Sequence, residues 1–496
     1  MHIKRTCGVL LHPTSLPGPD GIGSLGSNAR LFVDLLVDMG MSIWQILPLT
    51  PPAYGNSPYS SYSAFAGNPL LIDCEQLLKE GDLSLDNISA ISSGNRVDFS
   101  EVSSHKEKLL RWAAHSFFER GDADRTKEFK TFCGATPWLH DYALFMAIKR
   151  KFNGAPWNLW PDEIPLGSPE LYESLSIELD WEIGVQKYQQ WQFFRQWGDL
   201  RKYASERGIR IIGDLPFFVA YDSADVWRGR KNFLLDEKGL MEGVAGVPPD
   251  YFSENGQLWG NPLYDWDALK QKGYAWWIDR LKQMFSMFDT VRIDHFRGFE
   301  AVWRVPAGAD TARDGGWIPG PGADFFETIR ASLGTLSVIA EDLGIITPEV
   351  EKLRDSCSFP GMKILQFAFD SGSDNPYLPH NHTKNSVVYT GSHDNNTTPG
   401  WLCELSPEHL DAIREYIGCA QDEVVEGMLR LALMSVADQA IIPFQDLLGL
   451  GGGARMNTPG TTENNWEWRF SWKMVPHNLK SEIRKMVKCY GRLASG

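Results

Sequence analysis

The chain is short of positive charge. Its 496 residues carry 48 Lys and Arg against 63 Asp and Glu, which gives a formal net charge of −15 at pH 7. Nucleic acids and anionic membrane surfaces attract proteins with a basic excess, so we expect neither as a partner. This charge balance favours a neutral molecule as the partner.

Long hydrophobic segments and paired cysteines are also missing. No uninterrupted apolar run is long enough to span a bilayer, and the first residues enter a short strand-like run without a hydrophobic signal region. The seven cysteines are odd in number, widely scattered and never in a Cys-x-x-Cys pair, which indicates neither a disulfide framework nor a zinc knuckle. We therefore expect a cytoplasmic protein with reduced thiols.

Eight short strand-like runs are present, and helix-like patterns separate most of them. The strand-like runs are Cys7–Leu11, Ser42–Leu47, Ile209–Ile212, Thr290–Ile293, Ser337–Ala340, Lys363–Phe367, Ser386–Thr390 and Gln439–Pro443. The helix-like patterns include Asn28–Met39, Gln186–Arg207, Ala275–Phe288, Asp324–Leu333 and Pro348–Ser356. Such alternation predicts an α/β fold, a (β/α)8 TIM barrel formed by the single domain 1–496.

The uneven spacing of these runs predicts two insertions into the barrel. About 160 residues separate the second and third runs, far more than a barrel crossover needs, and they include the helical patterns Thr126–Thr131 and Leu139–Phe152. We expect a largely helical subdomain over approximately 55–205. A second segment, approximately 222–266, is rich in Gly, Pro and aromatic residues and predicts a folded lid or wall.

Acidic residues follow several of the predicted strands. Asp294, Glu341 and Asp394 lie at or just beyond three strand ends, with Asp214 at a fourth. In a barrel these ends meet at one mouth, where two carboxylates could act as nucleophile and proton donor on a glycosidic bond. Arg292 shares a strand face with Asp294 and would keep it ionised, whereas Glu341 has no basic neighbour in sequence. Taken in isolation, this stretch favours a purely structural role for Asp294, paired with Arg292 or Arg297.

Several motifs carry a family resemblance. They are Val291–Gly298, Ile339–Gly344, Thr390–Asn395, His12–Pro17, Ser57–Phe65, Gly213–Pro216, Gly246–Phe252 and Arg455–Gly460. Together, in this order and over nearly the whole chain, they resemble the amylomaltases, the 4-α-glucanotransferases or disproportionating enzymes of the α-amylase clan. The clan's histidine after the third strand is replaced here by the Phe217–Phe218 region, a departure that amylomaltases share.

The resemblance implies roles for individual residues. Asp294 would be the nucleophile, Glu341 the acid/base and Asp394 the carboxylate that stabilises the transition state. We expect the substrate to be bound by Arg292, His393, Asp214, Tyr59, Trp259, Asp250, Ser57 and His295. Tyr59 and Trp259 could instead be loop anchors on the barrel rim, but their place beside the inferred mouth favours stacking on sugars.

Two patterns point to other chemistry. Gly449–Ala454 fits a dinucleotide-binding motif, but Pro459-Gly460 cuts short the helix that would hold a pyrophosphate. His295, His393 and Asp394 could form a metal centre, but they stand where sugar hydroxyls need hydrogen-bond donors. We expect neither a metal nor a cofactor.

The sequence therefore predicts a retaining 4-α-glucanotransferase. It would cleave α-1,4-glucans such as maltooligosaccharides, starch or glycogen chains, and pass the glucanosyl unit through an ester on Asp294 to the 4-hydroxyl of another glucan or of glucose. An α-1,4-glucan hydrolase is the alternative enzyme. A non-catalytic glucan-binding protein is the alternative outside enzymes.

Overall fold

The computed structural model describes residues 5–87, 91, 94–161, 163–249, 254–420 and 423–494. Its centre is an eight-stranded parallel sheet in the order β10-β11-β12-β1-β2-β3-β6-β9. The strands are β1 (Thr6–Leu10), β2 (Ile43–Gln45), β3 (Arg210–Leu215), β6 (Thr290–Ile293), β9 (Val338–Ala340), β10 (Gly361–Ile364), β11 (Ser386–Tyr389) and β12 (Gln439–Pro443). The Ala340 amide donates to the Pro360 carbonyl at 2.9 Å, which brings β9 beside β10 and nearly closes the barrel. The predicted (β/α)8 barrel is confirmed, and each strand-like run overlaps one strand. The overlap is smallest for Lys363–Phe367, because β10 ends at Ile364 and Leu365–Phe367 form a 3-10 helix.

Both faces of these strands are buried, which explains their apolar sequences. Alternate residues such as Leu10, Ile43 and Ile441 fill the barrel interior, while residues such as Trp44 and Val291 pack outward. The helices on the outside include α1 (Ser27–Asp38), α7 (Asp180–Glu206), α10 (Ala275–Met287), α11 (Gly322–Leu333), α12 (Pro348–Ser356), α15 (Val424–Met434) and α17 (Leu479–Cys489). The shorter helices α13 (Thr398–Leu402) and α14 (Pro407–Ile417) lie between β11 and β12, and α16 (Phe444–Leu447) follows β12.

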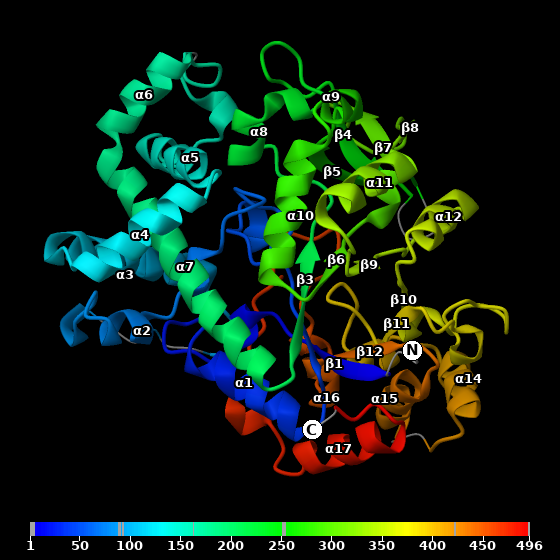
Figure 1. The fold of residues 1–496 in the computed structure, drawn as a ribbon. Coiled ribbons are helices and arrows are strands. Elements are labelled where there is room, and N and C mark those ends of the chain that lie inside the picture. Colours follow the sequence, from blue (N-terminus) through cyan, green and yellow to red (C-terminus); the bar gives the residue numbers. More distant parts are fainter. Residues whose placement is uncertain are drawn as a thin grey trace.

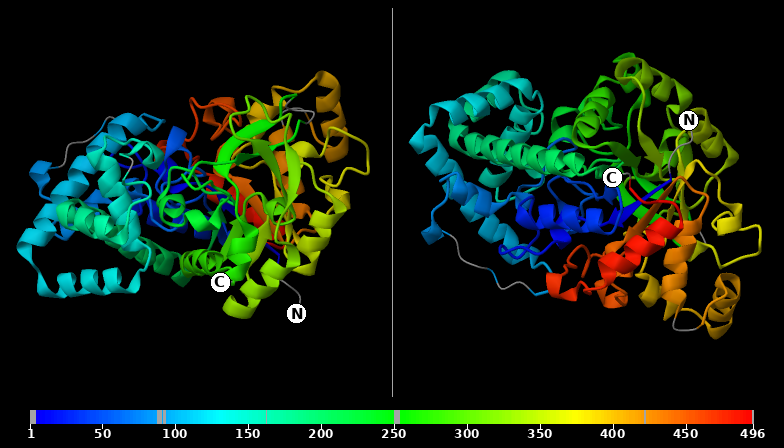
Figure 2. Two further views of the ribbon diagram at one scale, coloured as in Figure 1. Left: turned by 90° about the horizontal axis from the view of Figure 1, so that it is seen from above. Right: turned by 60° about the horizontal axis from the view of Figure 1, so that its bottom comes forward.

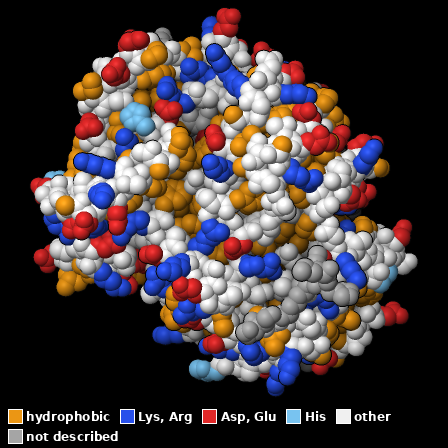
Figure 3. Space-filling view, viewed as in Figure 1, with side chains coloured by type: hydrophobic (Ala, Val, Ile, Leu, Met, Phe, Trp, Pro, Cys, Tyr) orange, Lys and Arg blue, Asp and Glu red, His pale blue; other side chains and the backbone are white. Residues whose placement is uncertain are grey.

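Most of the chain between β2 and β3 forms a helical lobe beside the barrel (Figures 1 and 2). Its helices are α2 (Cys74–Lys79), α3 (Phe99–Arg120), α4 (Ala123–Ala135), α5 (Leu139–Lys151), α6 (Pro169–Glu178) and the first part of α7. The 27-residue helix α7 runs from this lobe back to β3. Figure 3 shows hydrophobic side chains gathered along the hollow between the lobe and the rest of the molecule.

A second sheet lies over the barrel mouth and is not predicted from the sequence. Its four antiparallel strands are ordered β5-β4-β7-β8, with β4 (Gly243–Val247), β5 (Gln257–Pro262), β7 (Ala301–Pro306) and β8 (Gly316–Pro319). The predicted lid segment supplies only β4 and β5, along with α8 (Ala224–Arg228) and the start of α9 (Trp266–Gln271). The other two strands follow β6, so this wall is assembled from two separate connections. Within the described residues, none of the helices combines the length and apolarity needed to cross a membrane.

Candidate active site

Arg292 joins two carboxylates at the end of the barrel. It stands opposite Asp214 in the register between β6 and β3, so both side chains lie on the inner face. One guanidinium nitrogen of Arg292 donates to both oxygens of Asp214 at 2.8 Å, and another donates to Asp294 at 2.9 Å. Asp214 is fully buried, whereas the Asp294 side chain is 30% exposed. Arg292 therefore fixes Asp294 at the mouth from below.

Glu341 stands beside Asp294 because β6 and β9 are paired in register up to Ile293 and Ala340. Its two carboxylate oxygens accept backbone amides, from His295 at 2.7 Å and from Leu343 at 2.9 Å. His295 reaches this position in the left-handed conformation, with φ of 52°. The tight turn after Asp294 therefore helps to hold the Glu341 carboxylate by a backbone hydrogen bond and does not supply a positively charged side chain to it.

These different environments separate the two acids electrostatically. Burial and the nearby charge of Asp294 raise the pKa of Glu341 to about 7. Burial also raises the pKa of Asp294 above its ordinary value, although the Arg292 guanidinium opposes this shift. The predicted Arg292 contact is present, but burial outweighs it. Since only Asp294 bonds to a cation, Glu341 is the member of the pair that holds a proton near neutral pH.

Asp394 lies beyond β11 and is strongly ionised. Its carboxylate is 3.3 Å from Nε2 of His393 and accepts a hydrogen bond from Asn457 Nδ2 at 2.7 Å. Burial would raise its pKa, but His393 and Asn457 lower the pKa to about 2. In return, Asp394 raises the pKa of His393 despite the burial of the imidazole. The Asp394 side chain is 46% exposed, so it can still accept hydroxyls from a ligand.

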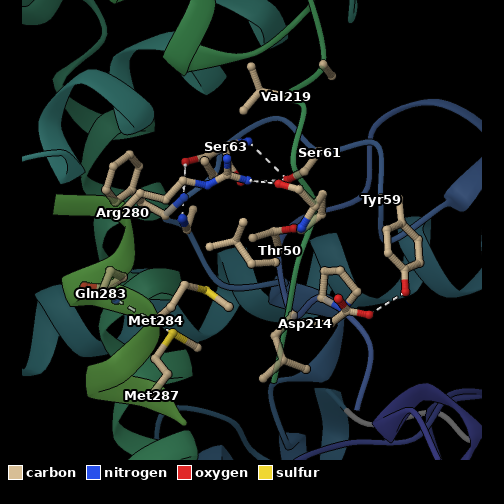
Figure 4. A pocket seen from close by; sticks show the side chains of 18 of the residues that line it. Thr50, Tyr59, Ser61, Ser63, Asp214, Val219, Arg280, Gln283, Met284 and Met287 are labelled. Atoms are coloured by element: carbon tan, nitrogen blue, oxygen red, sulfur yellow. Dashed lines mark hydrogen bonds between the residues drawn. The ribbon is translucent and has the colours of Figure 1, made fainter. Parts of the chain in front are cut away.

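Tyr59 connects these groups from a loop. Its hydroxyl donates to Asp214 at 2.6 Å and lies 3.3 Å from Nδ1 of His393. Its ring stacks on the His393 ring, with centroids 4.9 Å apart and planes 19° apart. Figure 4 shows Tyr59 and Asp214 on one side of an internal cavity and Gln283 of α10 on the other. One face of Tyr59 is therefore covered by His393.

Trp259 approaches the acids from β5 of the second sheet. Its ring is 38% exposed and meets the His295 ring edge to face, with centroids 4.8 Å apart. Burial lowers the pKa of His295 to about 3, so the imidazole is neutral at pH 7. Nε2 of His295 has no hydrogen-bond partner among the described residues. Trp259 therefore offers a partly exposed flat ring at the mouth, and this Nε2 atom of His295 is buried beside it.

The sequence also matches the model of a known protein family. The family model described as 4-alpha-glucanotransferase matches residues 11–475. The chain belongs to the 4-alpha-glucanotransferase family. It is therefore a glucanotransferase that acts on α-1,4-glucans, as the resemblance implies.

Several relatives match nearly the whole length of this glucanotransferase. The 4-alpha-glucanotransferases of Synechocystis sp. and Thermus thermophilus are 49% and 46% identical, over 99% of this chain and 98% and 100% of theirs. The structure of the amylomaltase of Streptococcus agalactiae in complex with acarbose is 39% identical, with a TM-score of 0.96 over 99% of this chain and 100% of that one. The amylomaltase of Corynebacterium glutamicum, at 19% identity, shares the fold with a TM-score of 0.79 over 98% of this chain and 75% of that one.

The remaining predicted site residues of the glucanotransferase lie elsewhere. The Ser57 hydroxyl accepts the Tyr59 amide at 3.2 Å and so shapes the loop that carries Tyr59. Asp250 lies outside the described residues, as do Tyr251 and Phe252 of the same motif. No group of three or more His, Cys, Asp or Glu in the described ranges is arranged to hold a metal ion.

Sequence reasoning missed the loop after β12 as a source of site residues. Asn457 bonds to the Asp394 side chain, and Arg455 donates to its backbone carbonyl at 2.6 Å. Trp466 packs against Tyr59 and His393, with ring centroids 5.9 Å from each. The motif Arg455–Gly460 contributed to the resemblance, but nothing in its spacing indicates which residue faces Asp394.

Proposed function

We propose that this glucanotransferase works by a retaining, two-step transfer through Asp294. In the first step, Asp294 attacks the anomeric carbon of a glucose unit, and the bond from that carbon to the 4-oxygen of the next unit breaks. Glu341 gives its proton to the departing oxygen. The observation that carries this proposal is the contrast between the two acids, since Asp294 bonds to Arg292 while burial raises the pKa of Glu341 to about 7.

The second step reverses the first with a new acceptor. Glu341, now ionised, takes the proton from the 4-hydroxyl of an acceptor glucan, and that oxygen displaces Asp294 from the anomeric carbon. Two inversions leave the α-configuration unchanged. Maltooligosaccharides and starch or glycogen chains serve as donors and acceptors, and glucose serves as an acceptor. The reaction as written needs no further reactant.

Asp394 and His393 are the groups that we assign to the glucose unit attached to Asp294. Asp394 is an exposed, ionised acceptor held between His393 and Asn457. Hydrogen bonds from sugar hydroxyls to such a carboxylate strengthen as positive charge develops in the transition state. Asp214 and Tyr59 support this region through Arg292 and His393.

Transfer must also outcompete water, which is present at about 55 M in bulk, by proximity and by exclusion of solvent. We assign this task to the loop 53–66, which carries Tyr59, and to the segment 246–260, which carries Trp259. The two segments come from the proposed subdomain at approximately 55–205 and the proposed lid at approximately 222–266. Support comes from Trp259 at the mouth, beside His295.

Incubation of the pure protein with maltotriose tests the proposal against its alternatives. Glucose together with maltooligosaccharides longer than maltotriose is the expected product pattern. Glucose and maltose alone would identify an α-1,4-glucan hydrolase, and an unchanged chromatogram would identify a binding protein. A cytoplasmic location also stays a prediction, because the relatives include bacterial proteins and one named chloroplastic/amyloplastic from Arabidopsis thaliana.

A further inference from the structure

A groove separates the helical lobe from the barrel, away from the three acids. One wall is a face of α10, on which Trp276, Asp279 and Gln283 follow one another at helical spacing. The opposite wall is the corner between α4 and α5, which carries Trp138 and Asp141. We call this space, of about 570 Å³, the lateral groove. Its volume lies within the range of sites that hold small-molecule ligands, roughly 300–1,000 Å³.

Three aromatic rings at the base of the lateral groove are fixed in place. The Phe65 ring stacks on Trp138, with centroids 6.2 Å apart and planes 25° apart. It meets Trp276 edge to face at 6.0 Å. The backbone that carries Phe65 is held as well, since the Ala64 amide donates to the buried Asp225 carboxylate at 2.7 Å. Because these rings are already held in place, little conformational entropy is lost when a flat ligand packs on them.

The polar groups around these rings suit a neutral polyhydroxyl ligand. Arg228 and Asp141 form an ion pair at 3.0 Å across the groove's edge. Asp279 contributes a carboxylate that accepts hydrogen bonds, and Gln283 contributes an amide that both donates and accepts them. The Tyr142 hydroxyl, on a residue that lines the groove and is 1% exposed, has no partner among the described residues. Without a surplus of cations, the lining does not favour an anion.

The lateral groove shares part of its lining with a cavity that reaches the residues behind the active site. Ser63, Phe65 and Gln283 line both the groove and the internal cavity of Figure 4. That cavity reaches Tyr59 and Asp214, which bond to each other and to the residues around Asp294. A ligand in the groove therefore lies against the same loop that positions Tyr59.

From this geometry we infer that the lateral groove is a second binding site for an α-1,4-glucan segment. A glucose unit has an apolar face of C–H groups for aromatic rings and hydroxyls for carboxylates and amides at its edge, which is the combination found here. The site would retain long donors or acceptors near the acids and would not take part in the chemistry. The inference rests on the proposed function, because it assumes a glucan substrate.

The test counts glucan sites on the full chain. Asp294→Asn prevents turnover, and calorimetric titration of this variant with maltoheptaose is expected to give two molecules bound per chain. Adding Ala135→Trp, at an exposed position on the groove wall, should reduce this number to one without changing the affinity of the remaining site. The matched control Ala123→Trp, at the exposed start of the same helix, should keep two.

Kinetics of the chain with Asp294 intact supply the second readout. Ala135→Trp should lower kcat/KM on the order of tenfold for maltoheptaose, the loss of one modest sugar contact, and leave maltotriose unaffected. Asp279→Ala, at an exposed residue, should show a smaller change in the same direction without filling the groove.

Three results would overturn the inference. The first is a single bound maltoheptaose in all the titrated variants, and the second is two bound molecules in Ala135→Trp. The third is an equal loss of kcat/KM for maltoheptaose and maltotriose in Ala135→Trp. An assembly that grows with protein concentration and is abolished by Ala135→Trp would assign the groove to a second copy of this chain instead. Absence of any glucan binding to the Asp294→Asn protein would overturn the proposed function as well.

Discussion

The two sides of the active site are built in different ways. On the barrel side, Asp214, Arg292, Asp294 and Glu341 stand on three neighbouring strands whose register and ion pairs fix them. On the other side, Trp259 comes from a separate sheet and is 38% exposed, and Asn457 comes from a loop. From this difference we expect the barrel residues to determine the chemistry and the surrounding connections to determine which acceptor reaches it.

The largest effect is expected from a substitution of Asp294, on the barrel side of the active site. Asp294→Asn should lower kcat by about four orders of magnitude or more, because an amide cannot form the ester. Glucose release from maltotriose measures the loss. The matched control is Asp289→Asn at the opposite end of the same segment, where the carboxylate accepts the Ile211 amide at 2.7 Å. Comparable losses in both variants would mean that Asp294 is structural.

The pH dependence should separate the two acids on the barrel side. On the proposed mechanism Glu341 acts in its protonated form, and its pKa is raised to about 7, so the first step should be present below pH 7 and lost as pH rises through this value. Glu341→Gln should remove this basic limb and lower kcat by roughly 10²–10⁴-fold with maltotriose. The loss should be much smaller with a glucosyl fluoride, whose leaving group needs no proton. A basic limb that persists in Glu341→Gln would contradict the assignment.

A smaller effect is expected on the loop side, from Asn457→Ala. The carboxylate of Asp394 would lose one of the hydrogen bonds that lower its pKa and hold it in place, so it should bind the sugar hydroxyls less well in the transition state. We expect kcat to fall about tenfold, the loss of one charge-assisted hydrogen bond. Thr461→Ala, in the same loop, is the control. If both variants only lose thermal stability and keep the parent kcat, Asn457 does not position Asp394.

Trp259→Ala is expected to change the overall rate least. Its main effect should be on the products that are formed. Removing this ring should weaken acceptor binding and raise the ratio of hydrolysis to transfer severalfold, because water needs no stacking surface. Free reducing ends measured against redistributed chains from maltotriose give the ratio. The exposed Trp181 of α7, changed to Ala, is the matched control. An equal fall in both reactions would make Trp259 an anchor for the donor or for the fold.

The barrel could be predicted from the sequence because its strands are buried on both faces and therefore read as short apolar runs. Asp294 and Glu341 could be placed because strand ends carry them, and parallel register then fixes them side by side. The second sheet could not be predicted, since Gly243–Val247 is glycine-rich and pairs not only with β5 but also with β7, which follows β6. Its partners are chosen by tertiary contact rather than by a local pattern.

The contacts made by the loops could not be predicted from the sequence either. The bond from Tyr59 to Asp214 spans 155 residues, and its stacking on His393 spans 334. The sequence indicates an aromatic loop beside the mouth, but whether a ring face is open to sugar depends on which distant side chain covers it. The same holds for Asn457, whose approach to Asp394 has no periodic signal.

The central claim is that Asp294 becomes covalently attached to the glucan. Mass spectrometry of the Glu341→Gln protein after reaction with a fluorinated glucosyl fluoride tests it most directly, because the ester should form without a proton donor and then persist. The account predicts one added sugar per chain, on the peptide that contains Asp294, and no adduct in the double variant Asp294→Asn, Glu341→Gln. A sugar attached to any other residue, or rapid turnover by the double variant, would contradict it.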